Sequence, residues 1–487
     1  MLSPASATSS PSPRTSSAPP DPPSTSPRPV PLLPPDTSYQ QFRTAHLLPN
    51  TPCLFPASYT RHWGVFRWLH GKEKDGKVDW KALERRFGVE RVEVVDCPAE
   101  GEEDEDEEEE VVERFADLLE LWKDGRGRKK YLKDWHLPLL LHRRGGGGAR
   151  EGREKVKEEL YEVEECWGDD WMNEWEGRGR ARGTSGEGGE RGEGEEGESG
   201  EREDDFRFVY AGGGKTWTGL HRDVYSSYSI TTNLHGRKRW CLFPPSLTPS
   251  LRPLLTAASH SGHSINPYTW PSSTLSSWVS RGLLIFTQEQ GETLFVPSGW
   301  FHSVVNISHP TFSLNHNWAN AHCLPAMYEG LKEEVGRARE AIADVRELLE
   351  KRRGDEGEGW RREWEGEVDR LVERSEGWSF PSFFSMIHHV LQNLCVPAEM
   401  VKQRAELGRW PAVKEENRPE LGFVVEQLRP ILHDFRHLRP EQEWGWLPGL
   451  EETVEGCERE VRRIEEWVEG RRRKEGKEEE KVETEKQ

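Results

Sequence analysis

The cysteines of this chain are few and scattered. They stand at positions 53, 97, 166, 241, 323, 395 and 457, and no two form a Cys-x-x-Cys pair. An odd set at such spacings predicts neither a disulfide framework nor a cysteine-based zinc module. We therefore expect a protein of a reducing compartment, the cytoplasm or alternatively the nucleus.

Long hydrophobic runs are also missing. No apolar segment approaches the roughly 20 residues that a membrane-spanning helix needs. The N-terminal segment is rich in Ser, Pro and Thr and lacks the apolar stretch of a secretory signal. Arg14 and Arg28 in this acid-poor segment leave a transit peptide as an alternative. We expect no membrane association.

The chain has no excess of positive charge either. Its formal net charge is −20, so a broad basic face is not expected, and we predict no direct nucleic-acid binding. Hydrophobic residues make up only 33% of the sequence, yet it contains 21 tryptophans, which indicate a packed core. Low-complexity segments therefore dilute a folded part.

Composition divides the chain into four parts. Residues 1–38 are Ser/Pro-rich and predicted to be disordered, and residues 39–320 form one domain. Acidic or Gly-rich inserts that cannot build a core interrupt this domain near 99–112, 143–157 and 177–203. Residues 321–469 are expected to be helical, and residues 470–487 form a charged tail.

Apolar periodicity predicts mainly β structure with added helices. A strand is expected at 91–97 and a helix at 112–122, which gives α/β elements before the main β region. Short strands that favour a sandwich or barrel are expected at 206–211, 229–233, 239–243, 283–286, 292–296, 303–307 and 312–315. Helical spacing follows at 325–349, 360–374, 383–394, 423–437 and 453–468.

One constellation of residues has the composition of a metal site. His221 and Asp223 form a His-x-Asp triplet, and His302 follows a Pro-Ser-Gly turn. Two imidazoles and one carboxylate make the facial triad that holds non-haem Fe(II) and leaves coordination positions open for O₂ and an oxo-acid. Strand periodicity would put His221 and Asp223 on one face, and we expect strands from opposite edges of a jelly roll to bring His302 to them.

Simpler interpretations exist for these residues. The chain has 17 histidines, so a His-x-Asp triplet arises by chance, and most histidines are surface or core residues. Asp223 could instead be a general base with His221 as its partner, but the sequence has no Gly-x-Ser-x-Gly element to supply a nucleophile. No His-Glu-x-x-His motif offers a rival zinc site.

An oxo-dicarboxylate on the metal would need a cation for its distal carboxylate. Strand alternation places Lys238 on the opposite face from Arg237 and Arg239, so it can point inward, although all three could form an exposed basic turn. Burying a lone ammonium is costly unless it meets an anion. Thr218 and Asn317 are candidate uncharged donors, or else ordinary turn and strand-end residues.

Several ordered motifs resemble the JmjC-domain oxygenases. They are the His-x-Asp triplet, Gly-x-Lys-Arg-x-x-Leu-Phe-Pro-Pro at 236–245, Pro-x-Gly-Trp-x-His at 297–302 and Asn-His-Asn-Trp at 315–318. The segments at 131–136, 169–174 and 206–212 further resemble the jumonji-domain-containing protein 4 group. The resemblance covers about residues 50–331 without the inserts, which depart from the family pattern together with both tails.

The resemblance implies a cupin-like double-stranded β-helix that uses Fe(II), 2-oxoglutarate and O₂. It implies hydroxylation of a protein substrate, a lysine of the translation termination factor. It assigns the iron to His221, Asp223 and His302, the co-substrate to Lys238, and the lining of the co-substrate pocket to Thr218 and Asn317. Two alternatives stay open: the protein could be a histone lysine demethylase, or it could be a cupin scaffold without catalytic activity. Tyr225, Tyr228 and Trp300 are expected to wall the cavity or to pack in the core.

Overall fold

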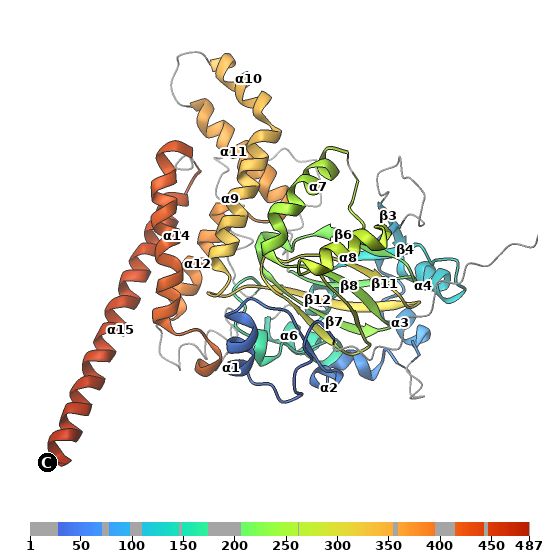
Figure 1. Cartoon of the computed structure of the whole chain (residues 1–487), viewed down its shortest axis with the longest axis horizontal. Coiled ribbons are helices and arrows are strands. Elements are labelled where there is room, and N and C mark those ends of the chain that lie inside the picture. Colours follow the sequence, from blue (N-terminus) through green and yellow to red (C-terminus); the bar gives the residue numbers. More distant parts are fainter. Residues whose placement is uncertain are drawn as a thin grey trace, which may run out of the picture.

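The computed structural model of the protein contains a β-sandwich with helices gathered beside one end of it (Figure 1). The structure describes residues 28–70, 77–97, 110–145, 149–173, 206–261, 263–353, 359–394, 414–442 and 447–486. The predicted insert at 177–203 lies outside these ranges. No helix in the described part of the chain is long and apolar enough to cross a membrane.

Two antiparallel sheets face each other. The larger has the strand order β1-β10-β7-β12-β5-β4-β2-β3, and the smaller has the order β6-β11-β8-β9. The strands are β1 Cys53–Phe55, β2 Arg91–Asp96, β3 Glu110–Arg114, β4 Lys130–Trp135, β5 Arg207–Gly212, β6 Trp217–His221, β7 Tyr228–His235, β8 Lys238–Phe243, β9 Leu284–Gln288, β10 Thr293–Val296, β11 Phe301–Asn306 and β12 Thr311–Trp318. The predicted jelly roll with α/β elements and a helical C-terminal region is confirmed.

The space between the sheets is filled by side chains from both of them. Trp240, Leu242 and Val304 of the smaller sheet pack with Leu294 and Val296 of the larger one. At the start of β8 the exposed Arg239 stands between the buried Lys238 and Trp240, as a strand period of two requires. Gly236 makes the turn from β7 to β8 with a φ of 81°, a conformation that favours glycine.

Residues 28–38 depart from the predicted disorder, and the rest of that predicted segment, residues 1–27, lies outside the described residues. Arg28 forms an ion pair with Glu292, and Leu32 forms a parallel bridge with Leu54. Val30 is fully buried in the core between the sheets. The buried Val30, the ion pair of Arg28 and the bridge of Leu32 together dock residues 28–38, and the described fold begins upstream of the predicted boundary.

Two predicted inserts also contain regular structure. The segment at 143–157 was expected to be an insert that cannot build a core, but α6 (Ala149–Glu159) packs against α5 (Leu137–Arg144) and buries Val156. Gly152 allows this approach because a Cβ there would lie 2.6 Å from the ring of His142. The predicted insert near 99–112 ends in regular structure, because β3 pairs with β2 and residues 110–114 are therefore a strand. The predicted helix at 112–122 begins only at α4 (Phe115–Lys123).

Helices cover the outer faces of both sheets. The remaining N-terminal helices are α1 Tyr39–Phe42, the π-helix η1 Arg43–Leu47, α2 Ala57–Thr60, η2 Gly64–Arg67, α3 Trp80–Phe87 and η3 Glu165–Trp167. Between β8 and β9 lie η6 Pro245–Leu247, α7 Thr248–Ser261, η7 Pro267–Thr269 and α8 Ser272–Ser280, which the apolar pattern did not predict. Leu251 of α7 and Trp278 of α8 pack on Phe243 of the smaller sheet.

The C-terminal region is helical, as predicted. Its helices are α9 Leu324–Ala341, α10 Ala343–Arg353, α11 Gly359–Glu376, α12 Phe380–Leu394, η8 Glu415–Asn417, α14 Leu421–Gln442 and α15 Leu450–Lys486. The predicted helix at 325–349 is broken at Ile342, and the predicted tail from residue 470 continues α15. These helices share one buried cluster with the larger sheet, in which Trp318 and Trp378 are both included. The helical region and the sandwich therefore form one packed body.

Candidate metal centre

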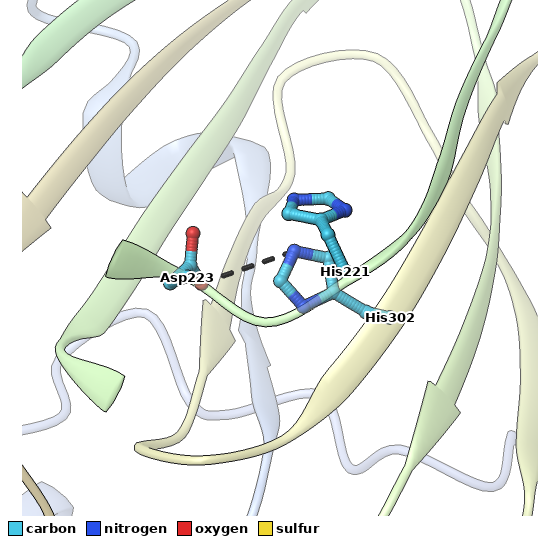
Figure 2. Close-up of side chains that lie close together, drawn as sticks. All are labelled: His221, Asp223 and His302. Carbon is cyan, nitrogen blue, oxygen red and sulfur yellow. Dashed lines mark ion pairs between the residues drawn. The ribbon is translucent and has the colours of Figure 1, made fainter. Parts of the chain in front are cut away.

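Two neighbouring strands of the smaller sheet present the histidines. His221 ends β6, and His302 in β11 is its register partner across the antiparallel ladder. Asp223 lies two residues after the end of β6 and is the N-cap residue of η5 (Val224–Ser226). One ligand atom from each of the three residues lies within 4.8 Å of the others (Figure 2). Two predictions about this arrangement are wrong: the strands are adjacent rather than at opposite edges, and Asp223 lies in a turn beyond the strand.

The backbone orients both imidazoles. The Nδ1 atom of His221 lies 2.8 Å from the carbonyl oxygen of Gly219, and that of His302 lies 3.1 Å from the carbonyl oxygen of Trp300. Because a carbonyl only accepts, each Nδ1 carries the hydrogen and each Nε2 is left with a free lone pair. Such second contacts fix the tautomer of metal-ligating histidines.

Burial keeps His302 in the neutral form that a metal ligand needs. Burial, followed by the nearby His221, lowers the pKa of His302 to about 4. The two rings are only 4.2 Å apart between centroids. His302 therefore offers a neutral imidazole over the whole physiological pH range.

Asp223 has one occupied and one unoccupied carboxylate oxygen. Its Oδ1 accepts a hydrogen bond of 2.9 Å from the Asn317 side-chain amide. Its Oδ2 is buried without a hydrogen-bond partner among the described residues and lies 3.8 Å from Nε2 of His302. A buried carboxylate oxygen without a partner is costly. A divalent cation held by Oδ2 and the two Nε2 atoms fits this donor set.

Asn317, which was predicted to line the co-substrate pocket, contacts the candidate metal ligand. Its side-chain amide donates to Asp223 and, at 3.4 Å, to Oγ of Ser227. Asn317 lies near the end of β12, in the larger sheet. The larger sheet thus orients a ligand that follows a strand of the smaller one.

Lys238 begins β8 and points into the molecule, whereas Arg237 and Arg239 are exposed, as the alternation predicted. The Lys238 side chain has no ion pair or hydrogen bond in the described part of the chain, and its Nζ lies 6.0 Å from the centre of the Tyr210 ring. Burial without a counter-ion lowers the pKa of Lys238 to about 7. This ammonium therefore fits an anion that enters from outside the chain.

Two tyrosines that the sequence did not single out line the same region. The Tyr131 hydroxyl lies 3.3 Å from Oγ1 of Thr218, which links β4 to β6. The rings of Tyr131 and Tyr210 are 6.2 Å apart. The Tyr210 hydroxyl donates to Asp134. Both tyrosines belong to segments that resemble the jumonji-domain-containing protein 4 group, and this resemblance is the sequence feature that could have indicated them as site residues.

The aromatic residues expected near the cavity belong to the core. Tyr225 and Tyr228 are part of the buried cluster on the outer side of the larger sheet. Trp300 packs in the core between the sheets and donates from Nε1 to the carbonyl oxygen of Asn50. The Trp240 indole lies beside one candidate metal ligand, with its ring centroid 5.9 Å from that of His302.

The fold and this site define a cupin-type protein with a candidate centre of two histidines and one carboxylate. The chain belongs to the cupin-like domain family, which matches residues 39–322. It is 28% identical over 363 residues to the mouse protein named 2-oxoglutarate and iron-dependent oxygenase JMJD4, covering 72% of this chain and 71% of the relative. The human protein of that name is 29% identical over 366 residues, with 72% of each chain covered.

A third relative carries a different name. The Arabidopsis thaliana protein named arginine-specific demethylase JMJ20 is 28% identical over 321 residues, covering 65% of this chain and 62% of the relative. The predicted resemblance to JmjC oxygenases of the jumonji-domain-containing protein 4 group is confirmed. The names of the mouse and human relatives give the cofactors, 2-oxoglutarate and iron, whereas the name of the Arabidopsis relative gives a demethylation reaction.

Proposed function

We propose that this protein is an Fe(II)- and 2-oxoglutarate-dependent oxygenase that hydroxylates a side chain of another protein. The observation that carries the proposal is the buried Oδ2 of Asp223, which has no hydrogen-bond partner in the described part of the chain and lies beside two imidazoles whose Nδ1 atoms face backbone carbonyls. The names of the mouse and human relatives support the cofactors. The proposed substrate is a lysine of the translation termination factor, in the cytoplasm, and its support is the family resemblance alone.

Each cofactor has candidate groups in this chain. His221, Asp223 and His302 would hold Fe(II). Lys238 would pair with the distal carboxylate of 2-oxoglutarate, and the hydroxyls of Tyr131 and Thr218 are candidate donors to the same group. The chemistry that these cofactors supply is the activation of O₂, coupled to decarboxylation of 2-oxoglutarate to succinate and CO₂ and to oxygen insertion at a substrate C–H bond.

The protein's own groups prepare this chemistry. The backbone carbonyls of Gly219 and Trp300 hold the histidine rings in the ligating tautomer. Asn317 holds one oxygen of Asp223 and leaves the other for the metal. Trp240 and the buried apolar side chains around it pack beside His302, and in such a low-dielectric environment charged groups interact strongly.

A demethylase is the second candidate. The Arabidopsis relative is named for arginine demethylation, and the same centre could act on an N-methyl group of a histone. The two candidates differ in the product, because hydroxylation adds one oxygen atom to the substrate whereas demethylation removes a methyl group as formaldehyde.

One assay separates these activities. The protein with Fe(II) and 2-oxoglutarate is incubated with termination-factor peptides and, separately, with methylated histone peptides, and products are followed by mass spectrometry. Oxygen addition to a termination-factor lysine supports the proposal, and methyl loss supports the second candidate. Absence of succinate with every peptide, in a protein that binds the metal, would favour a non-catalytic cupin scaffold.

A further inference from the structure

The turn that follows Asp223 has an unusual backbone. Tyr225 has φ 56° and ψ 18°, and Ser226 has φ 56°, so two consecutive residues that are not glycine adopt left-handed conformations. Such conformations are costly for residues with a Cβ and persist only where the surroundings hold them. The residues that contact this turn therefore bear on the position of the Asp223 carboxylate.

One face of α9 lies against the turn. A Cβ added to Gly330 would lie 2.9 Å from Oγ of Ser226 and 3.6 Å from the backbone carbon of Tyr225, so the absence of a side chain at residue 330 lets the helix approach closely. Glu333 and Glu334 follow three and four residues later on the same helix face. Their carboxylates lie 3.4 and 3.7 Å from the guanidinium of Arg222.

The helix α9 thus contacts the chain on both sides of the candidate ligand. Glu333 and Glu334 hold Arg222, the residue before Asp223, while Gly330 packs on the residues after it. The side chains of Arg222 and Glu334 are only 17% and 12% exposed, and the guanidinium lies 5.7 Å from the centre of the Phe301 ring, so this contact is partly shielded from water, whereas Glu333 is exposed.

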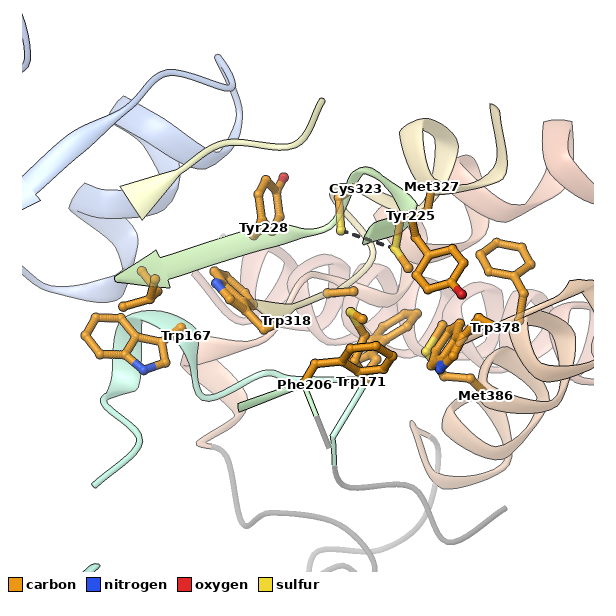
Figure 3. Packing of buried hydrophobic residues seen from close by; sticks show 14 of the residues in the cluster. Trp167, Trp171, Phe206, Tyr225, Tyr228, Trp318, Cys323, Met327, Trp378 and Met386 are labelled. Carbon is orange, nitrogen blue, oxygen red and sulfur yellow. Dashed lines mark hydrogen bonds between the residues drawn. The ribbon is translucent and has the colours of Figure 1, made fainter. Parts of the chain in front are cut away.

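The C-terminal helices support the turn at a second point. The Tyr225 ring packs against Trp378, with centroids 5.2 Å apart, and against Phe206, at 6.4 Å (Figure 3). Trp378 lies between α11 and α12 and is buried. From the opposite side, Oγ of Ser298 donates to the carbonyl oxygen of Ser226. The turn is therefore enclosed on several sides, as a strained conformation requires.

We infer that α9 is a positioning element of the metal centre: the face formed by Gly330, Glu333 and Glu334 holds the strained turn at 224–226 and thereby sets the place of the Asp223 carboxylate. The inference rests on the metal site of the proposed function. It assigns the C-terminal helices a role in the activity, because a small shift of the turn would move Oδ2 away from the two Nε2 atoms.

An ordinary packing contact makes a different prediction. If α9 only covered the core, a substitution at residue 330 would change the stability of the protein and leave its metal affinity unchanged. Metal affinity measured on folded protein separates the two, since outer contacts that orient ligands change affinity by about tenfold to a hundredfold.

The test compares two glycines of the same helix. Gly330→Ala places a methyl group against Ser226, whereas the matched control Gly336→Ala meets no atom within 4 Å. Both changes add the same helix-favouring methyl group. Co(II) is titrated into each metal-free protein and followed by its visible absorption, and thermal unfolding of each variant is recorded in parallel.

We expect Gly330→Ala to weaken Co(II) binding by about tenfold or more and Gly336→Ala to leave it unchanged. Ser226→Gly should restore affinity in the Gly330→Ala background, because it removes the opposing Oγ and suits a positive φ. Equal Co(II) affinities for Gly330→Ala and the wild type would overturn the inference. If Gly330→Ala fails to fold and the double variant folds but binds Co(II) poorly, the inference also fails.

The same titration tests the proposed function separately. Wild-type protein that takes up no Co(II), Mn(II) or Fe(II) would contradict the metal site itself, before any variant is compared. Wild-type binding with unaltered affinity in Gly330→Ala would leave the metal site intact and remove only the positioning role of α9.

Discussion

His302 lies directly across the β6–β11 ladder from His221, and the two rings are 4.2 Å apart between centroids. The ladder shifts register between His302 and Val304. Irregularities of this kind at sheet edges redirect side chains, and β6 is an edge strand of the smaller sheet. The pairing brings both imidazoles to one point, and only the carboxylate must come from outside the ladder.

Removing that carboxylate should abolish the centre. In Asp223→Ala two neutral imidazoles remain, which hold a dication poorly without a hard anionic ligand. We expect Fe(II) affinity to fall by more than about a hundredfold, beyond the range for outer contacts, and succinate production to stop. Calorimetric metal titration and a succinate assay measure the two effects. Asp344→Ala, at an exposed carboxylate of α10, is the control and should change neither. Succinate production at the wild-type rate in Asp223→Ala would refute the site.

Much of the jelly roll follows from local sequence pattern. The strands β5 and β7 to β12 were predicted because short apolar runs alternate with turn residues, and the inward face of Lys238 followed from strand alternation. The adjacency of β6 and β11 could not be predicted, because no local pattern encodes which strands pair. The approach of Asn317 to Asp223 depends on how the two sheets pack and was missed for the same reason.

Tertiary contacts also override composition in two segments. The Gly/Arg/Glu-rich stretch at 143–157 contains α6, because burying Val156 against the fold stabilises a helix that its composition alone disfavours. Val30 and the ion pair of Arg28 similarly help to dock a Ser/Pro-rich segment. An average over composition does not reveal such individual contacts.

Asn317 should act through Asp223 rather than through the co-substrate. Asn317→Ala removes the hydrogen bond to Oδ1, so Fe(II) affinity should fall by about tenfold to a hundredfold. Asn317→Asp should not restore the position of Asp223, because an ionised carboxylate cannot donate the hydrogen bond to Oδ1 that the amide donates. Asn393→Ala, at a buried asparagine within α12, is the control: it should lower the stability of the protein and leave its Fe(II) affinity unchanged. An unchanged Fe(II) affinity in Asn317→Ala, with a higher KM for 2-oxoglutarate, would return Asn317 to the co-substrate pocket.

The pKa of Lys238 predicts a pH dependence of co-substrate binding. Burial lowers this pKa to about 7 in the free protein, and a bound carboxylate raises it again. Above pH 7 binding must therefore take up a proton, and 2-oxoglutarate affinity should fall by up to about tenfold per pH unit. Calorimetry of the Mn(II)-loaded protein in buffers of different ionisation enthalpy measures this uptake. Proton release, or an affinity that is flat from pH 7 to 9, would contradict the assignment.

The same shift has a stability counterpart with a defined sign. In the unfolded chain Lys238 keeps its proton up to its ordinary pKa of 10.5, while the folded protein without co-substrate loses it near 7. Between these values the unfolded state binds more protons, so this group makes the free energy of unfolding rise with pH. Below pH 7 Lys238 is charged in both states, so the cost of burying its ammonium lowers the free energy of unfolding in full. Saturating 2-oxoglutarate should offset this cost.

Truncating the side chain tests the pocket most directly. In Lys238→Ala the distal carboxylate of 2-oxoglutarate would be buried without its cation, so the KM for 2-oxoglutarate should rise by the equivalent of roughly 2–5 kcal/mol, while Fe(II) affinity changes little. Lys238→Arg should recover only part of the loss, because a planar guanidinium does not fit a site shaped for an ammonium. Arg239→Ala is the matched control, since this neighbour is exposed on the opposite face of β8. If Arg239→Ala raised the KM and Lys238→Ala did not, the anion would lie on the outer face of the strand and the pocket would have to be reassigned.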